Sequence, residues 1–562
     1  MNALIIVAIS IVVLGGGYLL YGRWLVKTWG VDPNAKTPAY EKEDGEDYIP
    51  TNSLVVFSHQ FSSIAGAGPI TGPIIACMFG WLPALLWILI GGVFFGAVQD
   101  FTSMYASVKT KGKTIGSIIE NYIGKTGKTL FLIFEWLFSL LVIAAFADMV
   151  AGTFNGFAPN TSAPIYANGG TASMTMLFIF GAVIFGFFMK YAKPKSGVLA
   201  GCGIVFTAVL MLIGLNFPIY AGKGTWLVVI FAYLFIAAAL PMWVMIQPRD
   251  YLSTFLLLTM IAGAVIGLLV MHPSINLPVV TSFNVNGKML FPMLFVTIAC
   301  GAVSGFHSLV SSSTSSRQIK NEKDMLPIGY GAMLLESLLA VVALCVAGAA
   351  ADPVTHAAAQ GTPFAIFSRG VASFLVQIGM PQDAAMCVMN MAVSTLALTS
   401  LDAVSRIGRI AFQELFGQGN SSAAKFLSNK YISTIITLAC GCVLSLGGYN
   451  NIWPLFGSAN QLLAALVLIS LAVFLKCTGR QGWMLYVPMF VMLAVTFTAL
   501  VQSIILIVVK LGSNNFVFMT DGLQLIVAVL LVALGIMVAA SCLKTLFGKK
   551  ENSEKATSDT AV

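Results

Sequence analysis

The chain has 562 residues, of which 58% are hydrophobic and only 9% are charged, and its net charge is +8. Soluble domains carry about 25% charged residues, so this composition excludes a soluble protein and indicates an integral membrane protein. The net positive charge does not indicate nucleic-acid binding, because the basic residues gather in loops between apolar segments. The sequence also lacks a P-loop, which excludes a self-contained ATP-driven pump.

Apolar segments recur along almost the whole chain. A membrane-spanning helix needs about 20 mostly apolar residues. Fifteen segments are predicted to span the membrane: 3–22, 54–79, 82–107, 130–156, 172–191, 197–215, 225–246, 254–272, 289–312, 327–351, 384–402, 430–447, 455–475, 484–509 and 520–545. A further apolar stretch at 363–380 contains Arg369 and is predicted to be re-entrant or interfacial.

The distribution of basic residues predicts the topology. If successive loops lie on alternate sides, 26 of the 30 Lys and Arg residues share one side. The other side has only Lys223, Lys288, Arg369 and Lys510. The positive-inside rule places the basic side in the cytoplasm. We therefore expect the N-terminus outside and the C-terminus in the cytoplasm, with a polar, disordered tail over residues 546–562.

The second apolar segment contains a helix-breaking run from His59 to Pro73. Glycine and proline disfavour a regular helix, and a broken backbone inside a bilayer is tolerated only in protein or beside a water-filled cavity. Secondary transporters build substrate and ion sites at such breaks. The alternative is a kink that lets small residues pack at a helix crossing. The residues concerned are His59, Gln60, Gly66, Ala67, Gly68, Pro69 and Gly72.

Several carboxylates lie in or beside the predicted spans, where charges are costly and mark pathways, proton relays or structural pairs. Asp100 and Asp402 lie near helix ends, where an interfacial or capping role is the alternative. Asp148 and Glu336 lie deeper in their segments. They are therefore candidates for proton carriers or for partners of a buried cation.

Two motifs combine charges with helix ends. The run Leu240–Ser253 contains Pro241 and Trp243 inside a predicted span, followed by a turn with Arg249 and Asp250. Near the end of another span, Asp402 and Arg406 are spaced i,i+4, which is the geometry of a helical ion pair. We interpret this pair as a cytoplasmic gate or a structural latch.

Two further motifs are rich in polar side chains. Gly301–Ser316 places His307 beside a hydroxyl cluster that includes Ser304, Ser311, Ser312 and Ser313. The hydroxyls are candidates for binding a cation or a carboxylate-bearing solute, although serines also bond back to their own helix. Histidine suits proton coupling because its unperturbed pKa is about 6.5. Within Trp453–Gln461, the amides of Asn460 and Gln461 need partners once they are buried.

Together these motifs resemble the carbon starvation protein A (CstA) family. The resemblance covers about residues 20–475 and rests on six motifs in order: His59–Pro73, Gly96–Asp100, Gln247–Tyr251, Ser304–Ser312, Leu401–Arg409 and Phe456–Gln461. It implies a bacterial inner-membrane uptake protein for peptides or pyruvate that is coupled to ions. It also implies kinship to the amino acid/polyamine/organocation superfamily, whose LeuT-like core has two inverted five-helix repeats.

Laid onto that core, the predicted fold is an all-α membrane protein with broken first and sixth core helices, at Gly66–Pro73 and Pro241. The predicted units are a first helix with a polar loop (1–53), two repeats (54–215 and 225–402) and peripheral helices (403–545). In this arrangement Ser311, Ser312 and Ser313 are candidate sodium ligands on the eighth core helix.

The predicted function is secondary active transport by alternating access, coupled to H⁺ or Na⁺, with no enzymatic activity, metal site or other cofactor. The partners are a small-molecule solute and the lipid bilayer. Substrate would be bound by the seven residues named above in the helix-breaking run and by Pro241, Trp243, Ser304 and His307. The ion would be coupled by Asp148, Glu336 and the three serines Ser311, Ser312 and Ser313. Gating or structural roles go to Asp100, Arg249, Asp250, Asp402, Arg406, Asn460 and Gln461. The alternatives are a nutrient sensor, although no signalling domain is present, and a channel.

Overall fold

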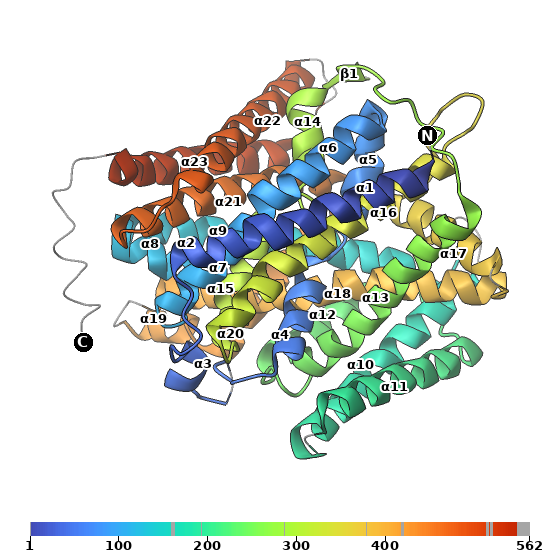
Figure 1. The fold of residues 1–562 in the computed structure, drawn as a ribbon, viewed down its shortest axis with the longest axis horizontal. Helices are drawn as coiled ribbons and strands as arrows, with labels where there is room; N and C mark the ends of the chain where they lie inside the picture. Colours follow the sequence, from blue (N-terminus) through green and yellow to red (C-terminus); the bar gives the residue numbers. More distant parts are fainter. Residues whose placement is uncertain are drawn as a thin grey trace.

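The computed structural model describes residues 2–45, 47–158, 163–192, 194–285, 287–377, 379–417, 421–512, 516 and 521–547. These residues are almost entirely helical (Figure 1). Within them, regular strand is limited to the antiparallel two-residue strands β1 (Asn284–Val285) and β2 (Lys288–Met289). The chain is therefore an all-α protein, as the sequence predicts.

The helices of the first half are α1 (Ala3–Gly16), η1 (Gly17–Gly22), α2 (Arg23–Trp29), α3 (Pro38–Glu41), α4 (Ser53–Ile64), α5 (Gly68–Ala76), η2 (Cys77–Phe79), α6 (Trp81–Gly91), η3 (Gly92–Gly96), α7 (Ala97–Lys109), α8 (Ile115–Ile123), α9 (Lys125–Phe154), α10 (Tyr166–Ala192), α11 (Ser196–Asn216), α12 (Lys223–Ala239) and α13 (Ile246–Met271). Those of the second half are α14 (Leu290–Thr297), α15 (Gly305–Ser313), η4 (Ser315–Arg317), η5 (Glu322–Asp324), η6 (Leu326–Gly331), α16 (Ala332–Ala350), α17 (Pro363–Gln377), α18 (Gln382–Phe416), α19 (Ser422–Leu427), α20 (Lys430–Ser445), α21 (Tyr449–Cys477), η7 (Trp483–Leu485), α22 (Tyr486–Gly512) and α23 (Leu523–Phe547).

Twelve helical segments of the described residues are long and apolar enough to cross a membrane. The other three predicted segments take different forms. Segments 225–246 and 430–447 contain the shorter helices α12 and α20, and segment 289–312 is divided between α14 and α15. The structure thus supports twelve full-length spans rather than fifteen. The stretch at 363–380 forms the 15-residue helix α17.

The helix break in the second segment lies at Ala65–Ala67, between α4 and α5. Ala65 leaves the helical region with ψ 56°, and Gly68 and Pro69 begin α5. Proline is well placed in the first turn of a helix, because its missing N–H has no partner there in any case. The sequence pattern therefore located this break within a few residues.

The second break is not where the sequence predicts it. Pro241 lies in the link between α12 and α13, because α12 ends at Ala239, so it does not interrupt a span. The break lies instead at Ile298–Ser304, between α14 and α15. Ile298 has ψ 69° and Ser304 is extended, so the backbone leaves the helix over this whole stretch. Proline disfavours helix at the residue before it, and here that residue, Leu240, already lies past the end of α12. Pro241 therefore marks the end of a helix and not a break inside one.

The centre of the molecule is built around the interrupted helices. Helix α4 packs on α13, α5 packs on α16, and α15 packs on α7 and α21. The long helices α9 and α18 pack along each other beside this group. The hairpin α10–α11 and the helices α22 and α23 lie at opposite edges (Figure 1).

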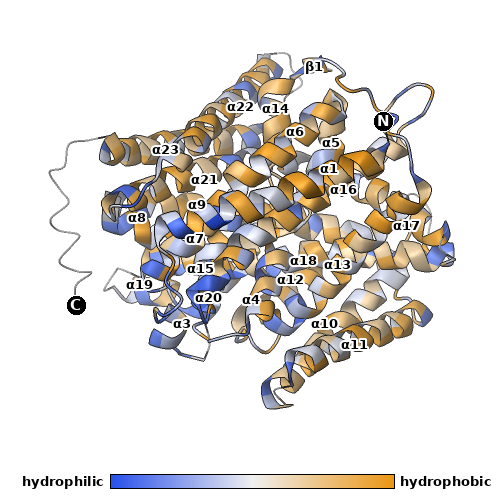
Figure 2. Cartoon of the chain, viewed as in Figure 1, coloured by the Kyte–Doolittle hydropathy of each residue, from blue (hydrophilic) through white to orange (hydrophobic). Residues whose placement is uncertain are grey.

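Hydrophobic residues predominate along the helices, and hydrophilic residues gather toward one end of the bundle, around α3, α8 and α19 (Figure 2). Exposed side chains such as Phe180 (70%), Leu212 (62%) and Val509 (63%) suit contact with lipid. We call the side on which α1 begins and α17 lies the N-terminal face. The opposite side, where α2 and α23 end, is the C-terminal face (Figure 1).

Candidate functional site

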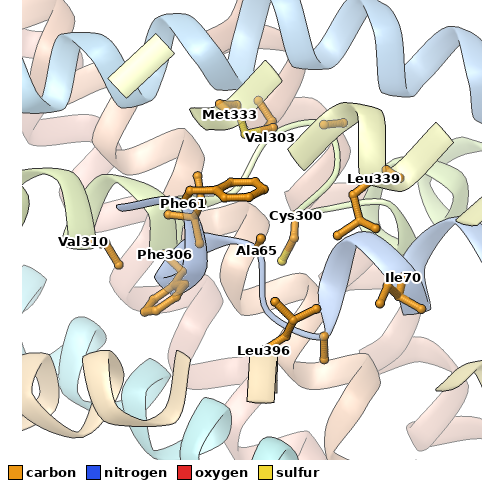
Figure 3. Close-up of a cluster of buried hydrophobic side chains, with 14 of the residues drawn as sticks. Phe61, Ala65, Ile70, Cys300, Val303, Phe306, Val310, Met333, Leu339 and Leu396 are labelled. Carbon is orange, nitrogen blue, oxygen red and sulfur yellow. The ribbon is translucent and has the colours of Figure 1, made fainter. Parts of the chain in front are cut away.

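The two helix breaks cross at the centre of the molecule. A Cβ added at Gly68 would collide with the Cys300 side chain, and one at Gly72 would lie 2.6 Å from the backbone oxygen of Thr297. Figure 3 shows Ala65 and Cys300 on the facing stretches of the two interrupted helices. The glycines therefore allow close approach of two backbones, which is the packing role that the sequence left as an alternative.

His59 on α4 is part of a buried hydrogen-bonded network. Its Nδ1 lies 2.6 Å from Oδ2 of Asp250 on α13, and its Nε2 lies 3.1 Å from Oγ1 of Thr314. The Thr314 hydroxyl donates to the carbonyl of Val310. Its oxygen can then accept from the ring, and the carboxylate accepts at the other nitrogen. Both ring nitrogens therefore have an oxygen partner within hydrogen-bond distance.

Arg249 joins this network to α18 and α12. It donates from Nη2 to Oδ1 of Asp250 (3.0 Å) and from Nη1 to Asp402, which also accepts the hydroxyl of Tyr233. Arg249 and both carboxylates are at most 1% exposed. The cluster thus places one guanidinium and one imidazole against two buried carboxyl groups. We call His59, Arg249, Asp250, Asp402 and Tyr233 the His59 network.

The predicted pair of Asp402 with Arg406 is wrong. Asp402 pairs with Arg249, whereas Arg406 donates to Oδ1 of Asp47 (2.8 Å) and to the backbone oxygen of Leu240 (2.6 Å). Both side chains are on α18, but tertiary partners on other elements take the place of the i,i+4 contact. Arg406 thus fixes the loop before α4 to α18, on the C-terminal face.

His307 on α15 lies between two carboxylates in a second buried cluster. Its Nδ1 is 3.2 Å from Oδ2 of Asp100 on α7, and its Nε2 is 3.4 Å from Oε2 of Glu336 on α16. All three side chains are completely buried. Among the described residues, none of their side-chain nitrogen or oxygen atoms makes a well-aligned hydrogen bond. Two carboxyl groups share one imidazole. Even with a protonated imidazole, two ionised carboxylates would leave a net charge of −1, so neutrality requires one more proton or a cation.

Amide side chains hold the second break in place. Nδ2 of Asn460 on α21 donates to the Ser304 hydroxyl (3.0 Å), and its Oδ1 accepts from the backbone N–H of Phe306 (3.0 Å). Gln461 donates to the backbone oxygen of Phe295 before the break and to that of Val303 within it. These amides therefore satisfy backbone groups that a continuous helix would pair internally, although Oε1 of Gln461 itself has no hydrogen-bond partner among the described residues.

Three of the four serines of the predicted cluster, Ser304, Ser311 and Ser312, are paired within the protein. Gln60 donates from Nε2 to Ser311 (2.8 Å) and accepts from Ser315 (2.6 Å), so it links α4 to the end of α15. Ser312 bonds back to the carbonyl of Ser308, and Ser313 is buried nearby on the same helix. The hydroxyls of Ser311 and Ser312 thus act as ties between helices and within α15.

Two predicted site residues lie away from both clusters. Pro241 and Trp243 are in the α12–α13 link, and the Trp243 ring packs against Lys190, whose Nζ lies 3.4 Å from the ring centroid. Their position at the edge next to α10 separates them from the helix breaks. Within the described part of the chain, His, Cys, Asp and Glu side chains form no group of three that could hold a metal ion.

Two cavities open on the N-terminal face. One, of about 530 Å³, has polar lining side chains, and Asp148 is among them in an ion pair with Lys223 (2.7 Å). The other, of about 470 Å³, is mainly apolar and includes Lys288 and Thr297. Pro363 at the start of α17 lies between the two cavities and lines both.

Sequence reasoning missed several of these residues. Lys223 was noticed only as one of four basic residues on its side, and Tyr233 has no signal because it lies in a uniformly apolar run. Thr71, which lines the larger cavity, lies inside the glycine–proline motif but was not singled out.

Comparison with known proteins identifies the family. The model of the family "Carbon starvation protein CstA" matches residues 2–358 and 348–499. The chain belongs to this family. The peptide transporter CstA of Escherichia coli is 33% identical, over 92% of this chain and 84% of that protein. The peptide transporter CstA of Bacillus subtilis (31%; 86% and 87%) and the pyruvate/proton symporter BtsT of E. coli (31%; 89% and 81%) are similar to a comparable extent.

Solved structures are more distant. A manganese transporter from Eremococcus coleocola aligns with a TM-score of 0.48 at 12% identity, over 90% of this chain and 99% of that one. MhsT in complex with L-phenylalanine aligns with a TM-score of 0.49 at 12% identity, over 86% and 99%. The chain is thus a multi-pass membrane protein of the CstA family. The prediction that it is not an enzyme agrees with relatives that are named as transporters.

Proposed function

We propose that this protein is a secondary active transporter that imports small carboxylate-bearing nutrients, peptides or pyruvate, across the bacterial cytoplasmic membrane by alternating access with proton coupling. The relatives named as peptide transporters and as a pyruvate/proton symporter support the substrate classes and the proton. The single observation that carries the proposal is the crossing of two interrupted helices, α4–α5 and α14–α15, each with a buried histidine cluster beside it.

The core of this transporter is proposed to be two inverted repeats that differ from the sequence expectation. The first repeat is α4–α5, α6–α7, α9, α12 and α13. The second is α14–α15, η6–α16, α18, α20 and α21. Both repeats begin with an interrupted helix, and both second helices begin near a Leu-Pro pair, Leu82-Pro83 and Leu326-Pro327.

Packing and helix length support the same pairing. The fourth members, α12 and α20, are the two short apolar helices. The fifth members, α13 and α21, pack on α4 and α15 respectively, and the third members, α9 and α18, pack on each other. The hairpin α10–α11 then becomes an insertion in the first repeat. This assignment replaces the expected boundaries 54–215 and 225–402.

The orientation is proposed from charge. Lys109, Arg317 and Arg406 make their ion pairs on the C-terminal face, with Glu322 and Asp47. Lys223 and Lys288 line the cavities on the N-terminal face, where basic residues are few. By the positive-inside rule, the C-terminal face is cytoplasmic and the cavities open to the outside.

The coupling proton is proposed to bind in the His307 cluster. Its two carboxyl groups and one imidazole are buried and poorly hydrogen-bonded, so a proton gained or lost there changes the charge balance strongly. The elements α7, α15 and α16 meet at this point, next to the second break. The His59 network, in which Arg249 bonds to the carboxylates of both Asp250 and Asp402, is proposed to hold the cytoplasmic side closed.

The test is uptake in liposomes that contain the purified full-length protein. Labelled pyruvate and labelled dialanine are offered under an inward proton gradient, an inward sodium gradient or no gradient. We expect at least one of the two solutes to accumulate, and we expect this accumulation to depend on the proton gradient. If neither solute accumulates under any gradient, the proposed function is wrong, and a sodium requirement would overturn the proposed ion.

A further inference from the structure

The larger cavity on the N-terminal face has a charge pair at its wall. Asp148 on α9 is 7% exposed, and its Oδ1 lies 2.7 Å from Nζ of Lys223, which begins α12 and is 44% exposed. A carboxylate that is nearly buried depends on its cation. Lysine has a flexible four-carbon stem, so its ammonium group can move toward a ligand, and a ligand cation at Asp148 would offset the loss of the ion pair.

Polar side chains that line this cavity are a second feature that indicates a ligand. Thr71 on α5 lines the cavity three residues after the helix break at Gly68, and its side chain is 1% exposed. Among the described residues its hydroxyl has no hydrogen-bond partner, which is unfavourable for a buried polar group. Asn390 and Asn168 also line the cavity and carry amide groups, and Nδ2 of Asn168 already donates to the backbone oxygen of Asn155 (2.8 Å). An unpaired hydroxyl, two amides and an ion pair thus converge on one space.

We propose that this cavity is a binding site for a zwitterion of dipeptide size. The ligand ammonium binds Asp148 and the ligand carboxylate binds Lys223, so that one ion pair is exchanged for two. Thr71, Asn168 and Asn390 then hydrogen-bond the peptide group. This assignment rests on the proposed transport function and deepens it, because it names the chemistry of the preferred solute.

Size and charge favour a dipeptide over pyruvate here. Two extended residues span about 7 Å, and the cavity of about 530 Å³ is within the range of small-molecule sites, roughly 300–1,000 Å³. Pyruvate carries a carboxylate but no cation. If it bound Lys223, it would offer no cation to replace the Lys223 ammonium at the nearly buried Asp148.

The first test uses the wild-type protein in liposomes and four competitors of labelled dialanine uptake. These are dialanine, N-acetyl-dialanine, dialanine amide and pyruvate. We expect unlabelled dialanine to compete at least about tenfold better than each of the others, because each of them lacks one of the two charges; a tenfold ratio corresponds to about 1.4 kcal/mol. If the acetylated or amidated dipeptide competes as well as dialanine, the inference is wrong.

The second test separates the two charges. Asp148→Asn is expected to shift the ratio of dialanine to pyruvate uptake at least about tenfold toward pyruvate, and Lys223→Met is expected to lower uptake of both solutes. The matched controls are Asp383→Asn, an exposed carboxylate at the start of α18, and Lys288→Met, which lines the other cavity. If a control variant shifts the ratio of dialanine to pyruvate uptake as much as Asp148→Asn does, the assignment of the zwitterion site is wrong.

The failures of the two proposals are distinguishable. If the wild type accumulates pyruvate but not dialanine, the zwitterion site is wrong and the transport function stands. If the wild type accumulates neither, transport itself is contradicted and the site falls with it. Since the competitor test uses the unaltered protein, a variant that fails to fold does not remove the test.

Discussion

The two faces of this protein are built differently. On the N-terminal face, two cavities of about 470 and 530 Å³ lie on either side of Pro363 and extend to Thr71 and Thr297 beside the helix breaks. On the C-terminal face, charged groups tie the helices together, through Arg249 with Asp402 and Arg406 with Asp47. In the proposed alternating-access mechanism, this difference corresponds to one end state, open on the N-terminal face and closed on the C-terminal face.

The closed face has an outer and an inner layer. In the outer layer, Lys109 pairs with Glu322 (2.7 Å), and the Tyr48 ring lies 5.1 Å from the Arg317 guanidinium. The inner layer is the buried His59 network. If the network holds the face closed, breaking it should have a much larger effect than breaking an outer contact, and the predictions below test this order.

The largest effect is expected from Arg249→Met. This change leaves Asp250 and Asp402 buried without their guanidinium, and breaking a buried pair in this way costs about 3–5 kcal/mol. We expect a large drop in the melting temperature of the purified protein and no uptake. The matched control is Arg369→Met, an exposed residue on α17. A melting temperature equal to that of the wild type would show that the network is not needed for stability.

The next largest effect is expected from Gly68→Val. The new side chain would collide with Cys300 across the two breaks, and overpacking of this kind costs about 1–3 kcal/mol. We expect uptake to be lost while the protein still reaches the membrane, with partial rescue by Cys300→Gly. Gly201→Val on α11 is the control, because a Cβ there meets no atom within 4 Å. Full activity of Gly68→Val would mean that the breaks need not approach closely.

A more selective effect is expected from His307→Gln. The glutamine keeps hydrogen-bonding capacity but cannot gain the proton, so we expect gradient-driven uptake to fall to the level measured without a gradient. Exchange of labelled for unlabelled solute should persist, because it needs no net proton movement. His356→Gln, in an exposed loop, is the control. Proton-driven uptake by His307→Gln at the wild-type rate would remove His307 from the coupling mechanism.

The smallest effect is expected from Asp47→Asn. Asp47 is 33% exposed, and its pair with Arg406 lies at the edge of the protein, where such pairs contribute about 0–1 kcal/mol. We expect a small decrease in melting temperature that disappears at high salt, since salt screens exposed charges. A decrease in melting temperature as large as that of Arg249→Met would contradict the expectation that the inner layer contributes more than the outer layer.

The sequence predicted the membrane class and the first break because composition and the glycine–proline run act locally. It did not predict the second break. Pro241 is a strong local signal, but it marks an ordinary helix end, whereas the stretch Ile298–Ser304 has no proline. The break there depends on amides from α21, which are distant in sequence.

The clusters were predicted only in part for a similar reason. His59, His307, Asp100 and Glu336 were recognisable because ionisable residues are rare in apolar segments. Their partners were not, since pairing depends on which helices pack together. Asp402 thus pairs with Arg249, 153 positions away, and not with Arg406 on the next turn.

The most direct test of the account is sided labelling of the larger cavity. A cysteine is introduced by Asn390→Cys in a background with the exposed Cys202 and Cys477 replaced by serine. In oriented vesicles without solute, a membrane-impermeant thiol reagent should modify this cysteine only when it is added on the N-terminal face. When solute and a proton gradient are present, the reagent should also modify it from the C-terminal face. Labelling from both faces without solute would contradict alternating access and indicate a channel.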